Sequence, residues 1–289
     1  MTFGHSFVIL EDKISKLSLD EYGNTIAENV IVASIDCDAV ISIAEDNEGL
    51  AELIAGLGCI LCSHMYALPE CLSDFSLLKS NELPAGSISY PMTLEKPVFT
   101  MAAEHLYKRV KTENRSLIEI PYQGTYRAVW EEVTGAAANK YFVMSPNRIN
   151  AGDFLSYLLK HPQKMGIVLA NKTACETLNE GAKSICGLPS FVFDAYLDDK
   201  GTKLYAVQLV KAGSEEQLSP FGLLYAVVDM LKYSLKLEKE AECLRACINN
   251  VLEAGWRTAD IALEGQLRVT AEAIFKLISE QIELVAELI

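Results

Sequence analysis

Basic residues are few in this sequence compared with acidic ones. Its 289 residues contain 25 Lys and Arg against 39 Asp and Glu, which gives a formal net charge of −14. Only seven residues are arginines, and none precedes Arg109. Proteins that bind nucleic acid normally present a basic patch, and an acidic surplus repels nucleic acid and anionic membranes. The charge balance therefore excludes both as expected partners.

Long apolar runs and export signals are also missing. No run approaches the roughly 18 to 20 residues of a membrane span. Residues 1–13 lack the basic segment and apolar core of a signal peptide. Eight cysteines are too few for a disulfide scaffold, so we expect reduced thiols in the cytoplasm. Because half of the residues are apolar, the chain is not a disordered one, and its length suits one large domain or two smaller ones.

Short apolar runs alternate with amphipathic segments along the chain, which is typical of an α/β fold. Strands are predicted at Ala39–Ile43, from Cys59, and at Leu117–Ile120, Gly166–Ala170, Phe191–Asp194 and Leu204–Val210. Helices are predicted at Glu48–Leu57, Thr93–Lys111, Arg127–Ala138, Asp153–Lys160, Cys175–Cys186 and from Pro220 onward.

One cluster of residues has the side-chain types of a zinc site. Cys59, Cys62 and His64 follow one another closely, and Cys71 lies shortly after them. Cysteine and histidine are the usual zinc ligands. However, Cys59 and Cys62 lie in or beside an apolar strand, and no second C-x2-C pair exists. Buried structural thiols are therefore favoured, and the role of the cluster stays open.

The strongest pattern lies in the C-terminal third. Its distinctive residues are Pro220, Met230-Leu231, Tyr233-Ser234-Leu235, Val251-Leu252, Gly255 and Arg257-Thr258-Ala259-Asp260-Ile261. In this order and spacing they resemble the closing helices of the isopropylmalate and isocitrate dehydrogenases, the β-decarboxylating dehydrogenases. Weaker similarity extends upstream to about residue 17.

The resemblance implies a two-domain α/β fold of the isopropylmalate dehydrogenase type. Residues 1–80 plus 196–289, the two chain ends, would form the first domain, and residues 81–195 would form the second. Family members dimerise through the second domain, so a homodimer is expected, or a hetero-oligomer with an intact paralogue. Relative to the family, the N-terminus is expected to be truncated, without the first strand, the Gly-rich turn and the first helix.

The family's chemistry needs residues that this sequence has changed. Arginines hold the substrate carboxylates, since guanidinium is permanently charged and bidentate. The stretch 53–69, which corresponds to an arginine motif of the family, contains neither Arg nor Lys. Tyr122 stands at the position of the catalytic lysine, give or take two residues. We do not expect a tyrosine to replace that lysine.

The metal motif is altered rather than lost. Glu176 and Glu180 correspond to two family aspartates, and their i, i+4 spacing places both carboxylates on one helix face. Asp153 lies one position from the aspartate that the partner subunit would supply. These three residues are the candidate ligands for Mg²⁺ or Mn²⁺. The alternative is that they form a solvated helix face.

The loop that grips the nicotinamide cofactor in the family should precede Pro220. In Val210–Pro220 only Gly213 and Ser214 resemble it, as remnants. Glu215 and Glu216 would repel phosphates. Neither NAD nor another resident cofactor is therefore expected.

The joint loss of arginines, lysine and cofactor loop favours a relative without the family's NAD-dependent oxidative decarboxylation. Such a protein would act as a regulatory, structural or ligand-binding homologue, and the sequence leans against an enzyme. The alternative is a divergent metal-dependent enzyme, an oxidoreductase or decarboxylase of a small hydroxy acid, that uses Asp153, Glu176 and Glu180.

Overall fold

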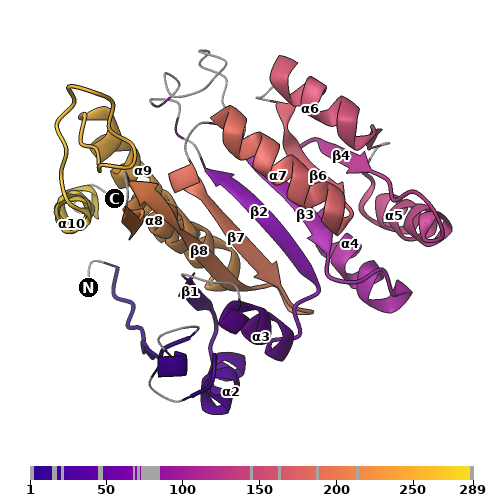
Figure 1. Cartoon of the computed structure of the whole chain (residues 1–289), viewed down its shortest axis with the longest axis horizontal. Coiled ribbons are helices and arrows are strands. Elements are labelled where there is room, and N and C mark those ends of the chain that lie inside the picture. Colours follow the sequence, from indigo (N-terminus) through magenta and orange to yellow (C-terminus); the bar gives the residue numbers. More distant parts are fainter. Residues whose placement is uncertain are drawn as a thin grey trace. The chain divides into compact units, whose positions relative to one another are not determined.

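The computed structural model describes residues 3–14, 18–20, 23–44, 48–67, 69, 72, 85–143, 146–161, 164–186, 189–212 and 215–286 (Figure 1). The chain divides into two compact units. Unit 1 contains both chain ends, Met1–Leu57 and Thr202–Ile289, and unit 2 is the middle segment Gly58–Gly201. The two units are compact groups of residues and are not by themselves domains. The domain boundaries expected from the sequence therefore stay a prediction.

Unit 2 is built on a mixed sheet. Its strands are β2 (Leu61–Ala67), β3 (Ala85–Pro91), β4 (Leu117–Ile120), β5 (Asn147–Arg148), β6 (Gly166–Ala170) and β7 (Val192–Leu197). Their order is β7-β2-β3-β6-β4-β5. Strand β2 runs antiparallel to β3 and β7, whereas β3, β6, β4 and β5 are mutually parallel. The parallel strands therefore end at the same edge of the sheet.

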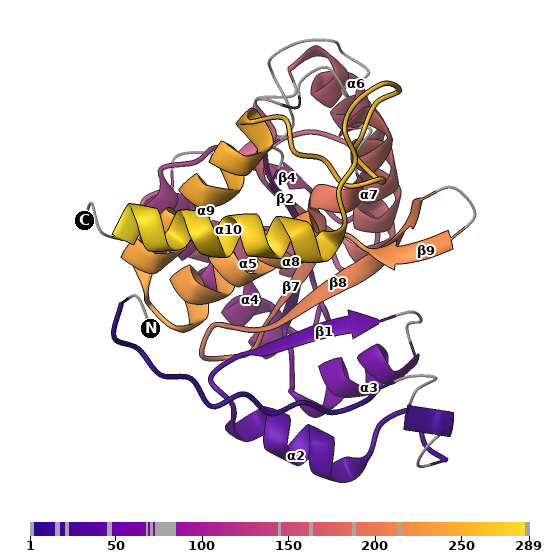
Figure 2. The same cartoon turned by 90° about the vertical axis from the view of Figure 1, so that its left-hand side faces the viewer.

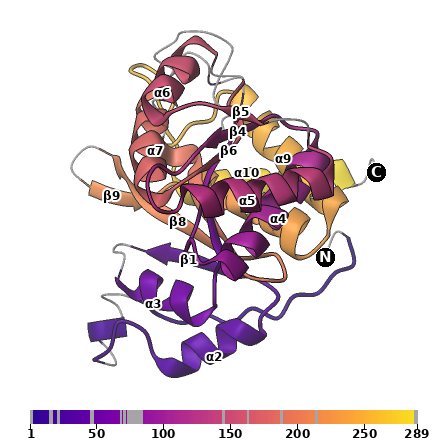
Figure 3. The same ribbon diagram turned by 90° about the vertical axis from the view of Figure 1, so that its right-hand side faces the viewer.

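Helices cover both faces of this sheet, as a sheet with parallel strands requires. On one face lie α4 (Lys96–Glu113) and α5 (Arg127–Tyr141). Their residues Phe99, Tyr107 and Trp130 are fully buried in a core that also contains Ile167 and Leu169 of β6. The other face carries α7 (Lys172–Cys186), which packs against α6 (Ala151–Lys160) (Figures 1 and 3).

The register of β3 against β6 depends on two glycines that lie opposite each other. Gly86 has a φ of +148° and Gly166 a φ of +58°, values that favour glycine. A Cβ atom on Gly86 would lie 1.7 Å from the carbonyl oxygen of Gly166, and one on Gly166 would lie 2.3 Å from Ser116 Oγ. Only glycine lets the two backbones approach this closely.

Substitution of Gly166 by alanine should therefore lower the free energy of unfolding by about 2–4 kcal/mol, through backbone strain and steric overlap. Gly135 in α5 is the matched control, because a Cβ atom there has nothing within 4 Å. Gly135→Ala should be neutral or stabilising by up to about 1 kcal/mol. Urea denaturation of both variants tests this, and equal stabilities would contradict it.

A buried carboxylate fixes the outer part of the same sheet. Glu119 of β4 is fully buried. It accepts hydrogen bonds from the Tyr107 hydroxyl and from Arg148 Nε of β5, the latter at 3.1 Å. Burial and the neighbouring carboxylate raise the pKa of Tyr107, so its hydroxyl stays protonated and can donate. A buried charge is tolerated only when it is paired in this way.

Arg148→Ala should destabilise the protein by about 3 kcal/mol, because it leaves the buried Glu119 carboxylate without its cation. The control pair is Arg127 and Glu131, whose side chains are 64% and 46% exposed. Arg127→Ala should cost less than about 0.5 kcal/mol. Thermal and denaturant unfolding would measure both, and a cost at Arg148 no larger than at Arg127 would contradict the account.

Unit 1 combines the strands β1, β8 and β9 with helices from both chain ends (Figure 2). Strand β8 (Thr202–Ala212) pairs with β1 (Val40–Ala44) in parallel and with β9 (Glu215–Leu218) in an antiparallel hairpin. Its helices are α2 (Glu28–Asp36), α3 (Glu48–Gly56), α8 (Pro220–Asp229), α9 (Glu238–Glu253) and α10 (Ala271–Ala286), with a π-helical turn at Met230–Ser234.

The residues of the C-terminal sequence pattern have structural roles in unit 1. Ser234 donates to the carbonyl of Thr202 at 2.7 Å and lies 2.8 Å from the Tyr205 hydroxyl, which ties the π-helical turn to β8. Arg257 is buried and donates to the carbonyls of Leu252 and Trp256 at the end of α9. A cation at a helix C-terminus satisfies exposed carbonyls and complements the helix dipole.

The α/β class predicted from the sequence is confirmed, and most of the predicted strands and helices lie within a few residues of the observed ones. Helix α2 and strands β3, β5 and β9 were not predicted. Helix was predicted from Pro220 onward, but the segment between α9 and α10 is not helical. Within the described ranges, no helix has both the length and the apolar content to span a bilayer.

Candidate functional site

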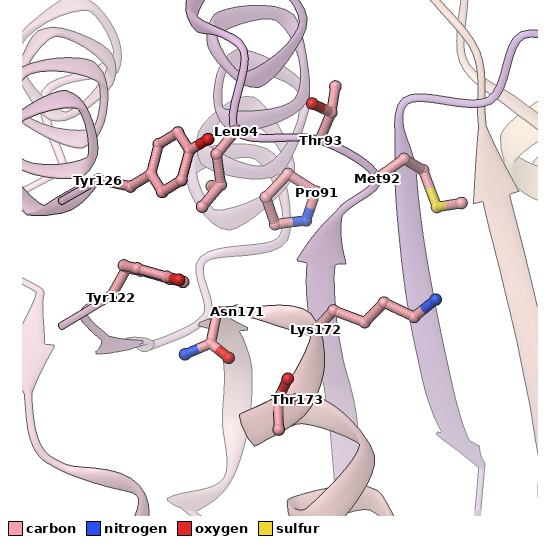
Figure 4. Close-up of a pocket in the computed structure, with 9 residues that line it drawn as sticks. All are labelled: Pro91, Met92, Thr93, Leu94, Tyr122, Tyr126, Asn171, Lys172 and Thr173. Carbon is pink, nitrogen blue, oxygen red and sulfur yellow. The ribbon is translucent and has the colours of Figure 1, made fainter. Parts of the chain in front are cut away.

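A hollow of about 230 Å³ lies at the edge of the unit 2 sheet where the parallel strands end (Figure 4). Its lining residues lie at or shortly after the ends of β3, β4 and β6: Pro91–Leu94, Tyr122, Tyr126 and Asn171–Thr173. Ligands of open α/β sheets bind outside the carboxyl ends of the strands. The position and the mixed polar and apolar lining suit a small molecule.

Two tyrosines form one wall of the hollow. The rings of Tyr122 and Tyr126 meet edge to face, with centroids 5.6 Å apart and planes at 90°. In Figure 4, the rings of Tyr122 and Tyr126 extend from the same side, and Leu94 is drawn next to Tyr126. Polar groups also line the hollow, Thr93 just after β3 and Asn171, Lys172 and Thr173 at the start of α7. A bound molecule would therefore meet both apolar rings and hydrogen-bonding groups.

The electrostatics of the hollow are set by three helix starts. Helices α4, α5 and α7 each begin just after a lining segment. The amide groups of a first helical turn carry partial positive charge. Asn171 caps α7 by accepting from the amide of Ala174 at 3.0 Å, and the amine of Lys172 adds a full positive charge. Together these groups favour an anionic or electron-rich ligand.

Tyr122, the residue predicted at the position of the family lysine, therefore lines this hollow. Its neighbours Tyr126, Asn171 and Lys172 were not predicted as site residues. Asn171 comes directly after the apolar run Gly166–Ala170, and this placement at a strand end is the signal that could have identified it.

The three predicted metal ligands do not come together within one chain. Glu176 and Glu180 are exposed on α7, and Glu180 forms an ion pair with Lys183 at 3.2 Å. Asp153 lies in the first turn of α6, where it exchanges hydrogen bonds with the N-cap Asn150. Among the described residues, no group of three or more His, Cys, Asp and Glu side chains could hold a metal ion.

The described residues of a single chain therefore do not fit Mg²⁺, which demands near-octahedral oxygen coordination. The sequence assigned Asp153 to a site completed by the partner subunit. The metal assignment accordingly stays a prediction about an assembly of two chains.

The segment predicted as the remnant of a cofactor loop belongs to a hairpin. Strands β8 and β9 pair from Leu209 with Leu218 as far as Ala212 with Glu215. Gly213 and Ser214, which join them in sequence, lie outside the described residues. Because the flanking residues are engaged in a backbone ladder, they do not form the long loop that the family uses for the cofactor. The prediction that NAD does not bind remains to be tested.

A buried polar network occupies the α7 face of the unit 2 sheet. His64 Nδ1 lies 2.5 Å from Asp194 Oδ1, and both side chains are 10% exposed. Cys62 lies two residues before His64 on β2. It is hydrogen-bonded to Tyr90 of β3 and Tyr196 of β7, the residues that pair with it on the two neighbouring strands. This arrangement follows from the antiparallel register, since opposite residues point to the same face.

The network holds its thiols protonated. Burial, and then the charge of Asp194, raises the pKa of Cys62 well above its usual value. The same two causes raise the pKa of Cys175, whose thiol contacts the carbonyl of Ile88. A thiol is nucleophilic only as the thiolate. The interpretation of Cys62 as a buried structural thiol therefore fits the structure, whereas Cys71 lies outside the described residues.

Cys62 and Cys175 should react with iodoacetamide at pH 8 more than about tenfold slower than Cys37 and Cys59, because each unit of raised pKa removes about nine tenths of the thiolate. Cys37 and Cys59 are the internal controls, since both are partly exposed. Mass spectrometry of native protein after timed alkylation measures the rates. Labelling of Cys62 as fast as of Cys59 would show that the thiol is accessible and ionised.

Comparison with known proteins assigns the chain to a family. The model of the isocitrate/isopropylmalate dehydrogenase family matches residues 99–278, which is more than half of the chain. The chain belongs to this family. The resemblance read from the C-terminal pattern is thereby confirmed.

Curated members of the isocitrate/isopropylmalate dehydrogenase family resemble this chain at low identity. The 3-isopropylmalate dehydrogenase of Chromohalobacter salexigens is 24% identical over 179 residues, which cover 61% of this chain and 48% of that protein. That of Halalkalibacterium halodurans is 25% identical over 158 residues, or 54% of this chain and 44% of that protein. The matched part thus spans about half the length of these relatives.

Solved structures show that the family fold is shared. A β-decarboxylating dehydrogenase from Thermococcus kodakarensis in its apo form has a TM-score of 0.74 and 15% identity, over 94% of this chain and 86% of that one. The isocitrate dehydrogenase of Methylococcus capsulatus has a TM-score of 0.72 and 10% identity, over 94% and 89%. At these identities the likeness establishes the fold alone.

Proposed function

We propose that this member of the isocitrate/isopropylmalate dehydrogenase family binds a small ligand at the unit 2 hollow and does not catalyse NAD-dependent oxidative decarboxylation. Its role is that of a ligand-binding, regulatory or structural homologue. The observation that carries the proposal is that Tyr122, which the sequence predicts at the position of the family lysine, lines the hollow.

The different chemistry of lysine and tyrosine side chains supports the proposal. A lysine ammonium brings a positive charge and a proton that it can give and take back. A tyrosine brings a neutral hydroxyl and an aromatic face, which suit binding better than proton transfer at neutral pH. Here the ring of Tyr122 also packs edge to face on Tyr126, which holds it in place as part of a wall.

The small number of arginines also supports the proposed loss of the family reaction. Family members hold substrate carboxylates with several arginines, and residues 1–108 contain none. Removal of a single group that stabilises a transition state costs several kcal/mol of activation free energy. Loss of the arginines together with the lysine leaves little of the original rate. The charge available at the hollow is that of Lys172 and the three helix starts.

The ligand class follows from that charge. A small carboxylate or phosphate compound would pair with Lys172 and with the first amides of α7, while its carbon skeleton rests on the two tyrosines. Each of these contacts is of a kind that anion sites use.

Titration calorimetry with a panel of small hydroxy acids, dicarboxylates and inorganic phosphate tests binding at the hollow. Lys172→Ala should weaken the tightest ligand by about tenfold, which corresponds to the loss of one charge-assisted contact. Lys160→Ala, an exposed lysine of α6, is the matched control and should bind as the unchanged protein does. Equal affinities of the two variants, or no binding by any compound, would contradict the proposal.

The alternative is a metal-dependent enzyme that uses Asp153, Glu176 and Glu180. In its favour, Glu176 and Glu180 are exposed at i, i+4 spacing and so remain available to a cation shared with a second chain.

Titration with Mn²⁺ discriminates the two functions. The alternative requires saturable binding that is lost in the Glu176→Gln/Glu180→Gln variant, together with Mn²⁺-dependent turnover of a hydroxy acid. Binding that is absent, or that survives the double substitution, removes the alternative.

A further inference from the structure

Tyr126 presents an aromatic ring to solvent at the hollow. It is 47% exposed, whereas the other tyrosines that the structure describes are buried or partly buried. It occupies the N-cap position of α5, where no side chain makes a capping hydrogen bond. N-cap positions favour Ser, Thr, Asp and Asn, whose side-chain oxygens satisfy the first amides of a helix. The start of α5 therefore does not explain why this residue is a tyrosine.

Tyr122 supplies a second ring beside it. Tyr122 is partly buried and packs against the core that contains Phe99 and Trp130, and its ring meets that of Tyr126 edge to face. In such a pair, the ring that presents its edge keeps both of its faces clear of the other ring. The two tyrosines thus hold each other in place and leave an aromatic face on which a third ring can stack.

The volume of the hollow limits the size of its ligand. It is about 230 Å³, which is below the roughly 300–1,000 Å³ of pockets that bind drug-sized molecules. A single six-membered ring with one charged substituent fits a hollow of this size, whereas a dinucleotide does not.

The remaining lining also suits a planar apolar ring with one charged group. Pro91, Met92 and Leu94 offer apolar contacts, and Lys172 offers a positive charge. A hydroxy acid of the same size would place hydroxyl groups against apolar side chains, and a hydroxyl without a hydrogen-bond partner costs free energy. An aromatic ring has no such polar group to satisfy.

From these observations we infer that the ligand of the hollow is a single aromatic ring that bears a carboxylate or phosphate group. The ring stacks on the tyrosine pair, and the anionic group pairs with Lys172. Tyr126 is then the residue that determines specificity for an aromatic ring. The inference rests on the proposed function, because it requires that the hollow binds a small anion.

Two pairs of ligands that differ in ring saturation test the inference. They are benzoate with cyclohexanecarboxylate, and phenyl phosphate with cyclohexyl phosphate, each titrated by ligand-observed NMR. The saturated ring is the bulkier and more apolar member, so apolar burial alone predicts that it binds more tightly. Stacking on tyrosine predicts the reverse order, with the aromatic member tighter by about three- to tenfold. Binding by one pair alone supports the inference and identifies the anionic group.

Substitutions at Tyr126 assign the preference to its ring. Tyr126→Leu keeps an apolar side chain but removes the aromatic face, so the preference for the aromatic member should vanish. Tyr126→Phe keeps the ring and should keep the preference. Tyr157→Leu is the matched control, since Tyr157 of α6 is partly exposed and does not line the hollow. It should leave all affinities unchanged.

Lys172→Ala separates the charge from the ring. It should weaken both members of a pair by the same factor and leave the ratio of their affinities unchanged, because both carry the same anionic group.

Equal affinities within the pairs, or tighter binding of the saturated members, would overturn the inference. So would a preference that survives in Tyr126→Leu, or binding of hydroxy acids or inorganic phosphate without binding of either aromatic ligand. The proposed function would stand after these results if Lys172→Ala still weakened binding. Absence of binding by every compound would refute the proposed function and the inference together.

Discussion

The parallel alignment of β6 with its two neighbours is the constraint on which the rest of unit 2 depends. All five residues of β6 are buried, and the strand pairs in parallel with β3 on one side and β4 on the other. The alignment brings three strand ends and three helix starts to one edge of the sheet. Tyr122, Leu94 and Asn171, far apart in sequence, become neighbours around one hollow for this reason.

The residues of the family pattern that the structure describes serve the scaffold of unit 1. The C-terminal pattern that identifies the family serves packing and capping, as Arg257 and Ser234 illustrate. These contacts need particular residues whether or not the protein turns over a substrate. In the proposed function the hollow is under no such demand, and the tyrosine expected at the lysine position forms part of its wall.

The sequence predicts the elements of this fold well where apolar periodicity is strong. Gly166–Ala170 and Leu117–Ile120 were predicted at their observed limits, because a fully buried strand is a short continuous apolar run. Strand β3 was missed since its residues Gly86, Ser87 and Ser89 look like a loop. They form a strand because the close approach to Gly166 and the contact of Ser89 with Ser63 hold them in the sheet.

The candidate site was predicted less completely, for a physical reason. A family pattern points to single positions, such as Tyr122, which lines the hollow. The partners of that residue come from other strands, and only the sheet order shows that they meet. The pair His64 and Asp194, 130 residues apart, likewise depends on the antiparallel register of β2 and β7.

The most direct test of the central claim, a retained family scaffold without the family reaction, is steady-state turnover. Purified protein would be assayed with isopropylmalate, isocitrate, malate and tartrate, each with NAD or NADP and with Mg²⁺ or Mn²⁺, beside an intact 3-isopropylmalate dehydrogenase. The account predicts no reduction of cofactor above the background without enzyme for any combination. A clear, protein-dependent rate with any of these substrates would contradict it.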